Sequence, residues 1–495
     1  MTIVHDWPQK SPGRGRLSAA MADDGLVNLT ATEAAAEIAR GALSAEDYAR
    51  ACLDRIDAVD GEIKAFVHLD RDHVLAQARA LDERRAQRHS IGPLHGIPVA
   101  IKDIIDTADY PTELGSPIGI GRRPRHDATV VEKLRAAGAV IIGKSVTTEF
   151  AYYHPGPTRN PHDVARTPGG SSSGSAAAVA AQMVPLALGS QTNGSVIRPA
   201  AFCGVFAVKP SHGLVSRAGV LALSRKLDHI GAFARSLPDL ALILEAIAGH
   251  DPADPDTEPF AAPDFRAVQR EPPPLPPRFA FVRTPVWNKA DGDTKAAFEE
   301  LAAALGSAVE PVDLPQSWAE AWEMHRTIMA TDMAHNLAPL VARGEPSEAL
   351  RKLLAHGRSV SAVDYLGALA KAQRYAAGLT DIFDAYDAIV TPAAPGVAPK
   401  GLGSTGDPTF CTLWTLTGLP ALSLPLFAGE GGLPLGAQLV GARGRDGRLL
   451  RTATALIEML RETKKGRRHS RAGIRRRAKP RDKLDTASHA LSRDI

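Results

Sequence analysis

The chain has 495 residues, 44% of them hydrophobic, and its net charge is +3. A chain of this length can bury a large core and could hold two or three domains. Its cysteines, Cys52, Cys203 and Cys411, form no C-x-x-C pair, and its histidines form no H-E-x-x-H motif. These patterns argue against a disulfide framework, a zinc site and a metal-dependent mechanism. We therefore expect no metal and no other cofactor.

The N-terminal region holds no apolar run of secretory-signal length, and nowhere do about 20 apolar residues follow one another as a membrane helix requires. We therefore expect a cytoplasmic protein with no membrane partner. Residues 1–25 carry proline, glycine, serine and charge, a composition typical of a disordered extension.

Two capped helices are predicted to follow this extension. Thr30 and Glu33 have capping-box spacing ahead of an alanine-rich segment, which Gly41 ends. Ser44 and Asp47 repeat the capping pattern for the next helix. The ordered domain is therefore expected to begin near residue 26.

An apolar run at residues 96–102, GIPVAIK, predicts a buried strand that ends in Lys102. A lysine in this place is usually a solvated strand end, so Lys102 alone indicates no function. Further along, Asp127 is the predicted cap of a helix that Gly138 ends, and residues 139–142 are a predicted strand.

The most informative stretch is residues 169–199, GGSSSGSAAAVAAQMVPLALGSQTNGSVIRP. Two Gly/Ser-rich turns place Ser171 and Ser195 on tight backbone, 24 positions apart. A Gly/Ser run alone is most often a flexible linker. The segment AAAVAA that follows has strong helix propensity, so the run is expected to open a helix. With Lys102, these serines are the groups that a Ser-Lys nucleophilic hydrolase needs.

These motifs resemble those of the amidase signature family of serine amidohydrolases. The family pattern has a lysine in G-I-P-x-x-x-K-D, here residues 96–103, then G-G-S-S-G-G-S, and a nucleophilic serine 24 residues later in G-G-S-I-R. The similarity extends over residues 25–460 and includes TLTGLPALSLPL and GLPLGAQLVG near the end. The resemblance implies an α/β fold: a single large α/β/α domain over residues 26–460, with a mixed β-sheet core covered by helices on both faces.

The resemblance also implies a catalytic triad of Lys102, Ser171 and Ser195. In the family the lysine is the ultimate base and acts when unprotonated, and burial among apolar residues would lower its pKa. The bridging serine, here Ser171, is held on a cis peptide bond and relays the proton, and Ser195 attacks the amide carbonyl. The backbone N–H groups that would stabilise the oxyanion are those of Thr192, Asn193, Gly194 and Ser195.

Four positions depart from the family pattern. Ser173 and Asn193 replace glycines, Gln191 replaces a common aspartate, and Arg198 lies one position later than the usual arginine. None of these changes removes a reacting group, and asparagine tolerates left-handed backbone better than other residues with a side chain. We expect a structural role for Arg198.

Toward the C-terminus, FAFV from residue 279 and AIVT from residue 388 are predicted buried strands. A last amphipathic helix is predicted over residues 449–460. Residues 461–495 then hold 13 Lys or Arg against 4 Asp or Glu, a net charge of +9. We expect a solvated, disordered tail; binding to nucleic acid or an anionic membrane, and a change of reading frame, stay open as alternatives.

The family resemblance implies an enzyme that cleaves a carboxamide to a carboxylate and ammonia or an amine, with a small-molecule amide and water as substrates. One alternative is the ammonia-supplying A component of a glutamyl-tRNA(Gln)/aspartyl-tRNA(Asn) amidotransferase, which works with partner subunits. Residues 409–414 look more like those of stand-alone amidases. A non-catalytic scaffold of the same fold is the other alternative, and the presence of all three triad residues argues against it.

The acyl group of the substrate is left open by the sequence, as is the oligomeric state, with a homodimer as one alternative. The segments expected to line the substrate pocket are residues 109–125, 150–160 and 320–375. The aromatic candidates in or next to them are expected to pack in the core rather than to contact substrate; they are Tyr152, Tyr153, Trp318 and Trp322.

Overall fold

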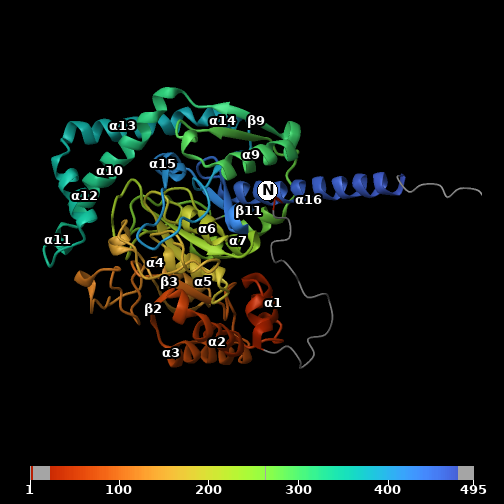
Figure 1. The fold of residues 1–495 in the computed structure, drawn as a ribbon. Coiled ribbons are helices and arrows are strands. Elements are labelled where there is room, and N and C mark those ends of the chain that lie inside the picture. Colours follow the sequence, from red (N-terminus) through yellow and green to blue (C-terminus); the bar gives the residue numbers. More distant parts are fainter. Residues whose placement is uncertain (1, 4–22, 262, 478–495) are drawn as a thin grey trace, which may run out of the picture.

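The computed structural model describes residues 2–3, 23–261 and 263–477, and its centre is a mixed sheet (Figure 1). The sheet has 12 strands in the order β2-β4-β3-β5-β7-β6-β11-β12-β10-β8-β9, and β1 pairs with β11. Neighbours among β4, β3 and β5 are parallel, as are those among β10, β8 and β9. The strands are β1 (Thr2–Ile3), β2 (Phe66–Leu69), β3 (Pro98–Lys102), β4 (Val140–Ser145), β5 (Leu186–Gln191), β6 (Phe206–Lys209), β7 (His229–Ala234), β8 (Phe279–Arg283), β9 (Val309–Asp313), β10 (Ala388–Pro392), β11 (Ala421–Ala428) and β12 (Pro434–Val440).

Helices flank this sheet on both faces, so that β3, β5, β6 and β7 are buried along their whole length. Helices α5 and α6 pack against each other and on the central strands, and α7 packs on β6 and β7 beside α4, α8 and α16. This arrangement confirms the expected α/β/α fold. The helices are α1 (Ala31–Ala39), α2 (Ala45–Ile63), α3 (Arg71–Ala86), α4 (Thr129–Ala136), α5 (Ser173–Ala180), α6 (Ile197–Cys203), α7 (Leu237–Ile247), α8 (Phe265–Arg270), α9 (Gly292–Leu305), α10 (Ala321–Asn336), α11 (Ala338–Val341), α12 (Glu348–Ser359), α13 (Ala362–Gly378), α14 (Thr380–Ala385), α15 (Thr409–Leu416) and α16 (Asp446–Arg477).

Helices α10 to α13 form a group on the opposite side of the molecule from α1 to α3 (Figure 1). Within the group, α10 packs against α12 and α13, and it also contacts α15. Because α15 lies next to the turn that carries Ser195, this packing brings the inner face of α10 to the edge of the site.

Several predicted elements are confirmed at the residues that the sequence indicates. Thr30 and Glu33 form a full capping box at the start of α1, and the Ser44 side chain caps α2. The helix predicted from Asp127 is wrong in its cap. Helix α4 begins at Thr129 after Ala128, and the Asp127 carboxylate instead accepts the N–H of Ala108 and pairs with Arg135.

The parallel strands place three chain segments at one edge of the sheet. Strand β3 ends at Lys102, its neighbour β5 ends at Gln191, and β4 on the other side ends at Ser145. Because the carboxyl ends of parallel strands lie on the same edge, Lys102 and the turn after β5 come together although 88 residues separate Lys102 from Ser190.

Described elements also occur outside residues 26–460, the predicted limits of the domain. Within residues 1–25, Thr2–Ile3 pair with β11 and a short 3-10 helix begins at Asp23; residues 1 and 4–22 lie outside the described residues. Helix α16 continues past residue 460 to Arg477, into the range predicted as a tail, and residues 478–495 lie outside the description. Among the helices of the described ranges, none is both long and apolar enough to span a bilayer.

A chain truncated after Thr463 should keep the wild-type rate of hydrolysis of a small amide. The expected site residues lie between Lys102 and Arg198, and the part of α16 that contributes buried apolar side chains, such as Leu449, Leu456 and Leu460, is retained. Ammonia release and the melting temperature of both chains measure the outcome. A truncated chain that melts like the full one but releases no ammonia would show that residues 464–495 belong to the active enzyme.

Candidate active site

Lys102 and Ser171 are joined by a short hydrogen bond inside the protein. The Lys102 side chain is fully buried at the end of β3, and its Nζ donates to Ser171 Oγ at 2.6 Å. Nζ also donates to Ser190 Oγ at 2.8 Å. The structure brings together Lys102 and Ser171, which the sequence analysis assigned to one site. The sequence held no signal for Ser190, which lies on β5 one position before Gln191.

The surroundings of Lys102 favour its uncharged form. Burial lowers the pKa of Lys102 well below the ordinary value for lysine, because the ammonium loses its solvation; the carboxylate of Asp228 opposes the shift. Burial also raises the pKa of Asp228 to about 6. A neutral amine has a lone pair, so Nζ can accept a proton from the Ser171 hydroxyl.

Ser171 lies two residues before the start of α5, on a backbone that is fixed from several sides. The peptide bond between Gly170 and Ser171 is cis, as the family resemblance implies. A side chain at Gly170 would bring a Cβ within 2.8 Å of Thr405 Cγ2, so this position has room only for glycine. The next residue, Ser172, exchanges hydrogen bonds of 3.2 Å with the backbone of Ser190, which ties the loop to β5.

Ser195 lies in the turn between β5 and α6 and lines the same cavity as Ser171. Its hydroxyl takes part in no hydrogen bond with the described residues, and none joins it to Ser171. The structure therefore contains the first link of the expected relay, from Lys102 to Ser171. It brings Ser195 to the same cavity without forming the second link.

The turn at residues 192–195 has its carbonyl groups and side chains anchored from outside the cavity. Thr415 Oγ1 donates to the carbonyl of Asn193 at 2.6 Å, and Thr412 Oγ1 donates to Asn193 Oδ1 at 2.8 Å. The carbonyl of Thr192 accepts a hydrogen bond from His325 Nε2 at 2.9 Å. Burial lowers the pKa of His325 to about 4, so the ring is neutral and carries its one proton on Nε2.

The N–H groups of this turn are left available. Among the described residues, none of the backbone N–H groups of residues 192–195 donates to a protein acceptor. Gly194 allows the close packing behind them, since a Cβ there would lie 2.8 Å from Pro408 Cβ. Four unpaired donors beside a serine hydroxyl can bind a developing negative charge.

Gln191 holds the first turn of α6 where the family commonly has aspartate. Its Oε1 accepts from the N–H groups of Val196 and Ile197 at 2.9 and 3.0 Å, while its Nε2 donates to Thr415 Oγ1 at 2.9 Å. A carboxylate could make the first two bonds but not the third. The same hydroxyl of Thr415 donates to the carbonyl of Asn193. One residue of α15 therefore holds both Gln191 and Asn193, two of the positions that depart from the family pattern.

The prediction for the aromatic residues is wrong for one pair. Tyr152 and Tyr153 line the cavity together with Ser195 rather than packing only in the core, and their rings meet edge to face with centroids 4.8 Å apart. Trp318 and Trp322 do not line this cavity; the indole of Trp322 donates to the carbonyl of Thr409 at 2.9 Å. Of the segments expected to line the pocket, 150–160 and 320–375 contribute Ala151, Met329 and Met333, whereas no residue of 109–125 lines this cavity. Leu223 and Thr405 complete the wall from outside those segments.

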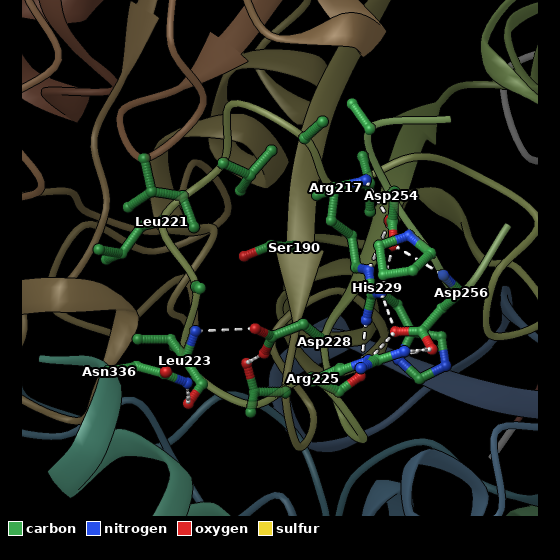
Figure 2. Close-up of a pocket in the computed structure, with 18 residues that line it drawn as sticks. Ser190, Arg217, Leu221, Leu223, Arg225, Asp228, His229, Asp254, Asp256 and Asn336 are labelled. Atoms are coloured by element: carbon green, nitrogen blue, oxygen red, sulfur yellow. Dashed lines mark hydrogen bonds and ion pairs between the residues drawn. The ribbon is translucent and has the colours of Figure 1, made fainter. Parts of the chain in front are cut away.

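A second cavity lies beside this site, with Ser190 and Asp228 on its wall (Figure 2). Asp228 Oδ1 accepts from Thr192 Oγ1 at 2.7 Å, which joins the wall of this cavity to the turn of the first. On the far side, Arg217 pairs with Asp254 at 2.7 Å and also with Asp256. The charge of that arginine is therefore neutralised by two carboxylates.

Within the described ranges, no group of three or more His, Cys, Asp and Glu side chains has a geometry that could hold a metal ion. The groups that converge on the cavity are hydroxyls, one buried amine, one guanidinium and backbone N–H groups. Such a set can perform nucleophilic acyl transfer.

Comparisons with known proteins agree with this chemistry. A family model described as Amidase matches residues 47–450. In Chloroflexus aurantiacus (strain ATCC 29366 / DSM 635 / J-10-fl), the A component of glutamyl-tRNA(Gln) amidotransferase is 39% identical over 472 residues, which cover 87% of this chain and 96% of that protein.

Solved structures give the same result. One, described as a vestigial protein complex that reveals the evolutionary origins of an s-triazine catabolic enzyme, has a TM-score of 0.81 and 31% identity, covering 87% of this chain and 98% of the other. The native peptide amidase from Stenotrophomonas maltophilia has a TM-score of 0.75 and 31% identity, covering 87% and 97%. The chain therefore belongs to the amidase signature family and is a hydrolase that acts on amide C–N bonds.

Proposed function

We propose that this protein hydrolyses a carboxamide to a carboxylate and ammonia or an amine through an acyl-enzyme on Ser195. The observation that supports this most directly is the 2.6 Å contact between the fully buried Lys102 amine and Ser171 Oγ, in a loop that lines the same cavity as Ser195. A serine hydroxyl is a weak nucleophile and needs such a base to attack an amide.

In the acylation half, Ser195 Oγ bonds to the amide carbon while its proton passes to Ser171 Oγ. The Ser171 proton passes in turn to Lys102 Nζ, which becomes an ammonium. The carbonyl oxygen becomes an oxyanion facing the free N–H groups of residues 192–195. When the C–N bond breaks, the same relay returns one proton to the leaving nitrogen.

In the deacylation half, water replaces the alcohol of Ser195 as nucleophile. Its proton follows the relay to Lys102, and its oxygen bonds to the acyl carbon. Collapse of the second tetrahedral intermediate releases the carboxylate and returns a proton to Ser195. Ser190 takes no proton in this scheme: its hydroxyl holds the Lys102 amine toward Ser171.

Replacing Ser195 by alanine should lower the rate of ammonia release by at least about 10³-fold, because the other hydroxyl of this turn, that of Thr192, donates to Asp228 and cannot replace the nucleophile. Covalent labelling by a serine-directed fluorophosphonate should be lost as well. Ser359→Ala, on an exposed end of α12, is the matched control and should label and turn over like the wild type. Normal turnover by the Ser195→Ala variant would assign the nucleophile elsewhere.

The rate should rise with pH, because only deprotonated Lys102 can accept a proton. Since burial lowers the pKa of Lys102, the midpoint of this rise should lie well below the ordinary lysine pKa of about 10.4. Lys102→Ala should lose about 10³-fold or more in rate, and Ser171→Ala should lose less, because the first removes the base and the second removes a relay.

Ser190→Ala serves as the control for this assignment. Its hydroxyl accepts a hydrogen bond from Lys102 Nζ, which favours the charged amine. Removing it should therefore move the midpoint of the pH–rate profile to lower pH while the protein stays active. A rate that is flat from pH 5 to pH 10, with the chemical step limiting, would argue against Lys102 as the base.

A second candidate function is that of the glutaminase component of a glutamyl-tRNA(Gln) amidotransferase, and the comparison with curated proteins favours it over a stand-alone amidase. Relatives described as the A component of that enzyme match 87% of this chain at 37–39% identity. In this case the protein would act in complex with other subunits, and the ammonia would pass to them.

The two candidates differ in their dependence on partners. If the second is correct, purified protein should hydrolyse glutamine slowly, and the remaining subunits of the amidotransferase should bind it and raise that rate by about 10-fold or more. Size-exclusion chromatography and glutamine hydrolysis measure both effects, with the Ser195→Ala variant as the control for activity from the added subunits. Absence of complex formation, together with rapid hydrolysis of other amides, would support the stand-alone enzyme.

A further inference from the structure

Arg198 is a buried cation beside the nucleophile, and part of its guanidinium has no partner. Its residue exposure is 2%, and it lines the cavity that contains Ser171 and Ser195. One terminal nitrogen, Nη2, donates to the carbonyl of Gly170 at 2.6 Å and to Thr405 Oγ1 at 3.1 Å. The other two, Nε and Nη1, form no hydrogen bond with any described residue.

The groups that face this guanidinium do not neutralise it. The Tyr153 side chain interacts with the guanidinium through its hydroxyl and its ring, which lies 5.9 Å from Cζ. Burial raises the pKa of Tyr153, so this phenol is uncharged and brings no negative charge to Arg198. Burial also raises the pKa of Cys411 to about 12, so that thiol is uncharged too. The remaining neighbour, Asp407, forms its ion pair with Lys289 at 3.4 Å, and no ion pair to Arg198 occurs within the described residues.

Arg217 shows what a neutralised arginine looks like in the same molecule. Its guanidinium pairs with Asp254 and Asp256 on the wall of the neighbouring cavity (Figure 2). Arg198 is more deeply buried than Arg217 and has no such carboxylate among the residues that the structure describes. Because an unpaired charge away from water is costly, buried cations are normally paired with an anion or neutralised.

We propose that the substrate of this enzyme carries a carboxylate, which pairs with the free nitrogens Nε and Nη1 of Arg198. This inference rests on the proposed function, since it assigns the substrate class of the Ser195 site. It adds a second role to the structural one expected from the sequence: Nη2 keeps a structural contact with Gly170, and the remaining donors serve the ligand.

The position of Arg198 also bounds the length of the substrate. Arg198 lies three residues after Ser195, and its Nη2 contacts the carbonyl of Gly170, the residue bonded to Ser171. The anionic group therefore lies only a few bonds from the amide that Ser195 attacks. Apolar side chains of Leu223, Met329 and Met333 line the space around it. A short monoamide of a dicarboxylic acid has this shape and charge.

The carboxylate of glutamine could pair with Arg198, but its ammonium would have no partner in the cavity. Glutamine has a carboxylate near its amide, and it also carries an ammonium. Among the described residues that line the cavity, Arg198 is the one with a formal charge at neutral pH, and no acidic side chain lines it. An amide with a carboxylate and no ammonium therefore fits this site better.

Binding to the Ser195→Ala variant tests the inference without turnover. The probes are three monoamides, malonamic, succinamic and glutaramic acid, each paired with the neutral amide of equal length: propionamide, butyramide and pentanamide. Calorimetry should give at least one acid with a Kd at least about 100-fold lower than that of its neutral partner. The Arg198→Gln exchange in the same background should remove this difference, and Arg198→Lys should restore part of it.

Arg225→Gln, which alters an exposed arginine on the rim of the neighbouring cavity, is the control and should leave the difference intact. Fluorophosphonate labelling of Ser195 in the Arg198→Gln single variant shows whether its cavity is formed. Should that variant misfold, the comparison of each acid with its neutral partner in the Ser195→Ala protein still decides the question.

Equal binding of every acid and its neutral partner would overturn the inference, as would an Arg198→Gln exchange that weakens both classes alike in a correctly folded protein. Neither result bears on the proposed function. That function would be contradicted by a different result, namely no labelling of Ser195 and no hydrolysis of any amide. Preference for the acids with loss on the Arg198→Gln exchange supports a carboxylate-bearing substrate.

Discussion

Desolvation of the Lys102 amine is the constraint on which the rest of the site depends. An ammonium at the end of β3 would lie among apolar strands with no carboxylate close enough to pair with it in the described part of the chain, so the site favours the neutral amine. The amine then needs polar neighbours that tolerate an uncharged group, and the hydroxyls of Ser171 and Ser190 fill this role at 2.6 and 2.8 Å. One of these hydroxyls belongs to the loop that opens α5, so burial of the lysine and placement of the relay are a single structural requirement.

Close approach of backbone segments makes this burial possible. Helix α5 consists of small residues, and a Cβ at Gly174 would lie 2.2 Å from the carbonyl of Ala65 and 2.4 Å from the N–H of Val146. A Cβ at Gly189 would lie 2.7 Å from Ser172 Oγ. The small residues of the Gly/Ser motif therefore allow α5 to lie against the sheet, and this packing excludes water from Lys102.

Sequence reasoning succeeded where the position of an element follows from local pattern. The strand that ends at Lys102, the turns at Ser171 and Ser195, and the helix between them are all encoded in short segments. It missed groups whose position depends on distant packing: Ser190 faces Lys102 through strand pairing, and Thr405 lies on the cavity wall beside Arg198, 207 positions away in the sequence. It left the surroundings of Arg198 open, because the partners of a guanidinium become visible only when all surrounding side chains are placed.

Two buried lysines on neighbouring parallel strands show what separates a base from a structural cation. Lys144, on β4, donates to the carbonyl of Ile105 at 2.7 Å and to Thr112 Oγ1 at 2.5 Å, and it lies 3.6 Å from an oxygen of Asp103. These partners favour the ammonium, so burial lowers the pKa of Lys144 only to about 8. Lys102 is equally buried but meets two hydroxyls and a more distant carboxylate, that of Asp228, and its pKa falls further. The difference lies in the acceptors: carbonyl and carboxylate oxygens can only accept hydrogen bonds and hold a proton on the amine, whereas a hydroxyl can also donate its proton to the amine. A lysine ringed by hydroxyls at the edge of a substrate cavity is therefore suited to take up and return protons, which is what hydrolysis of an amide requires.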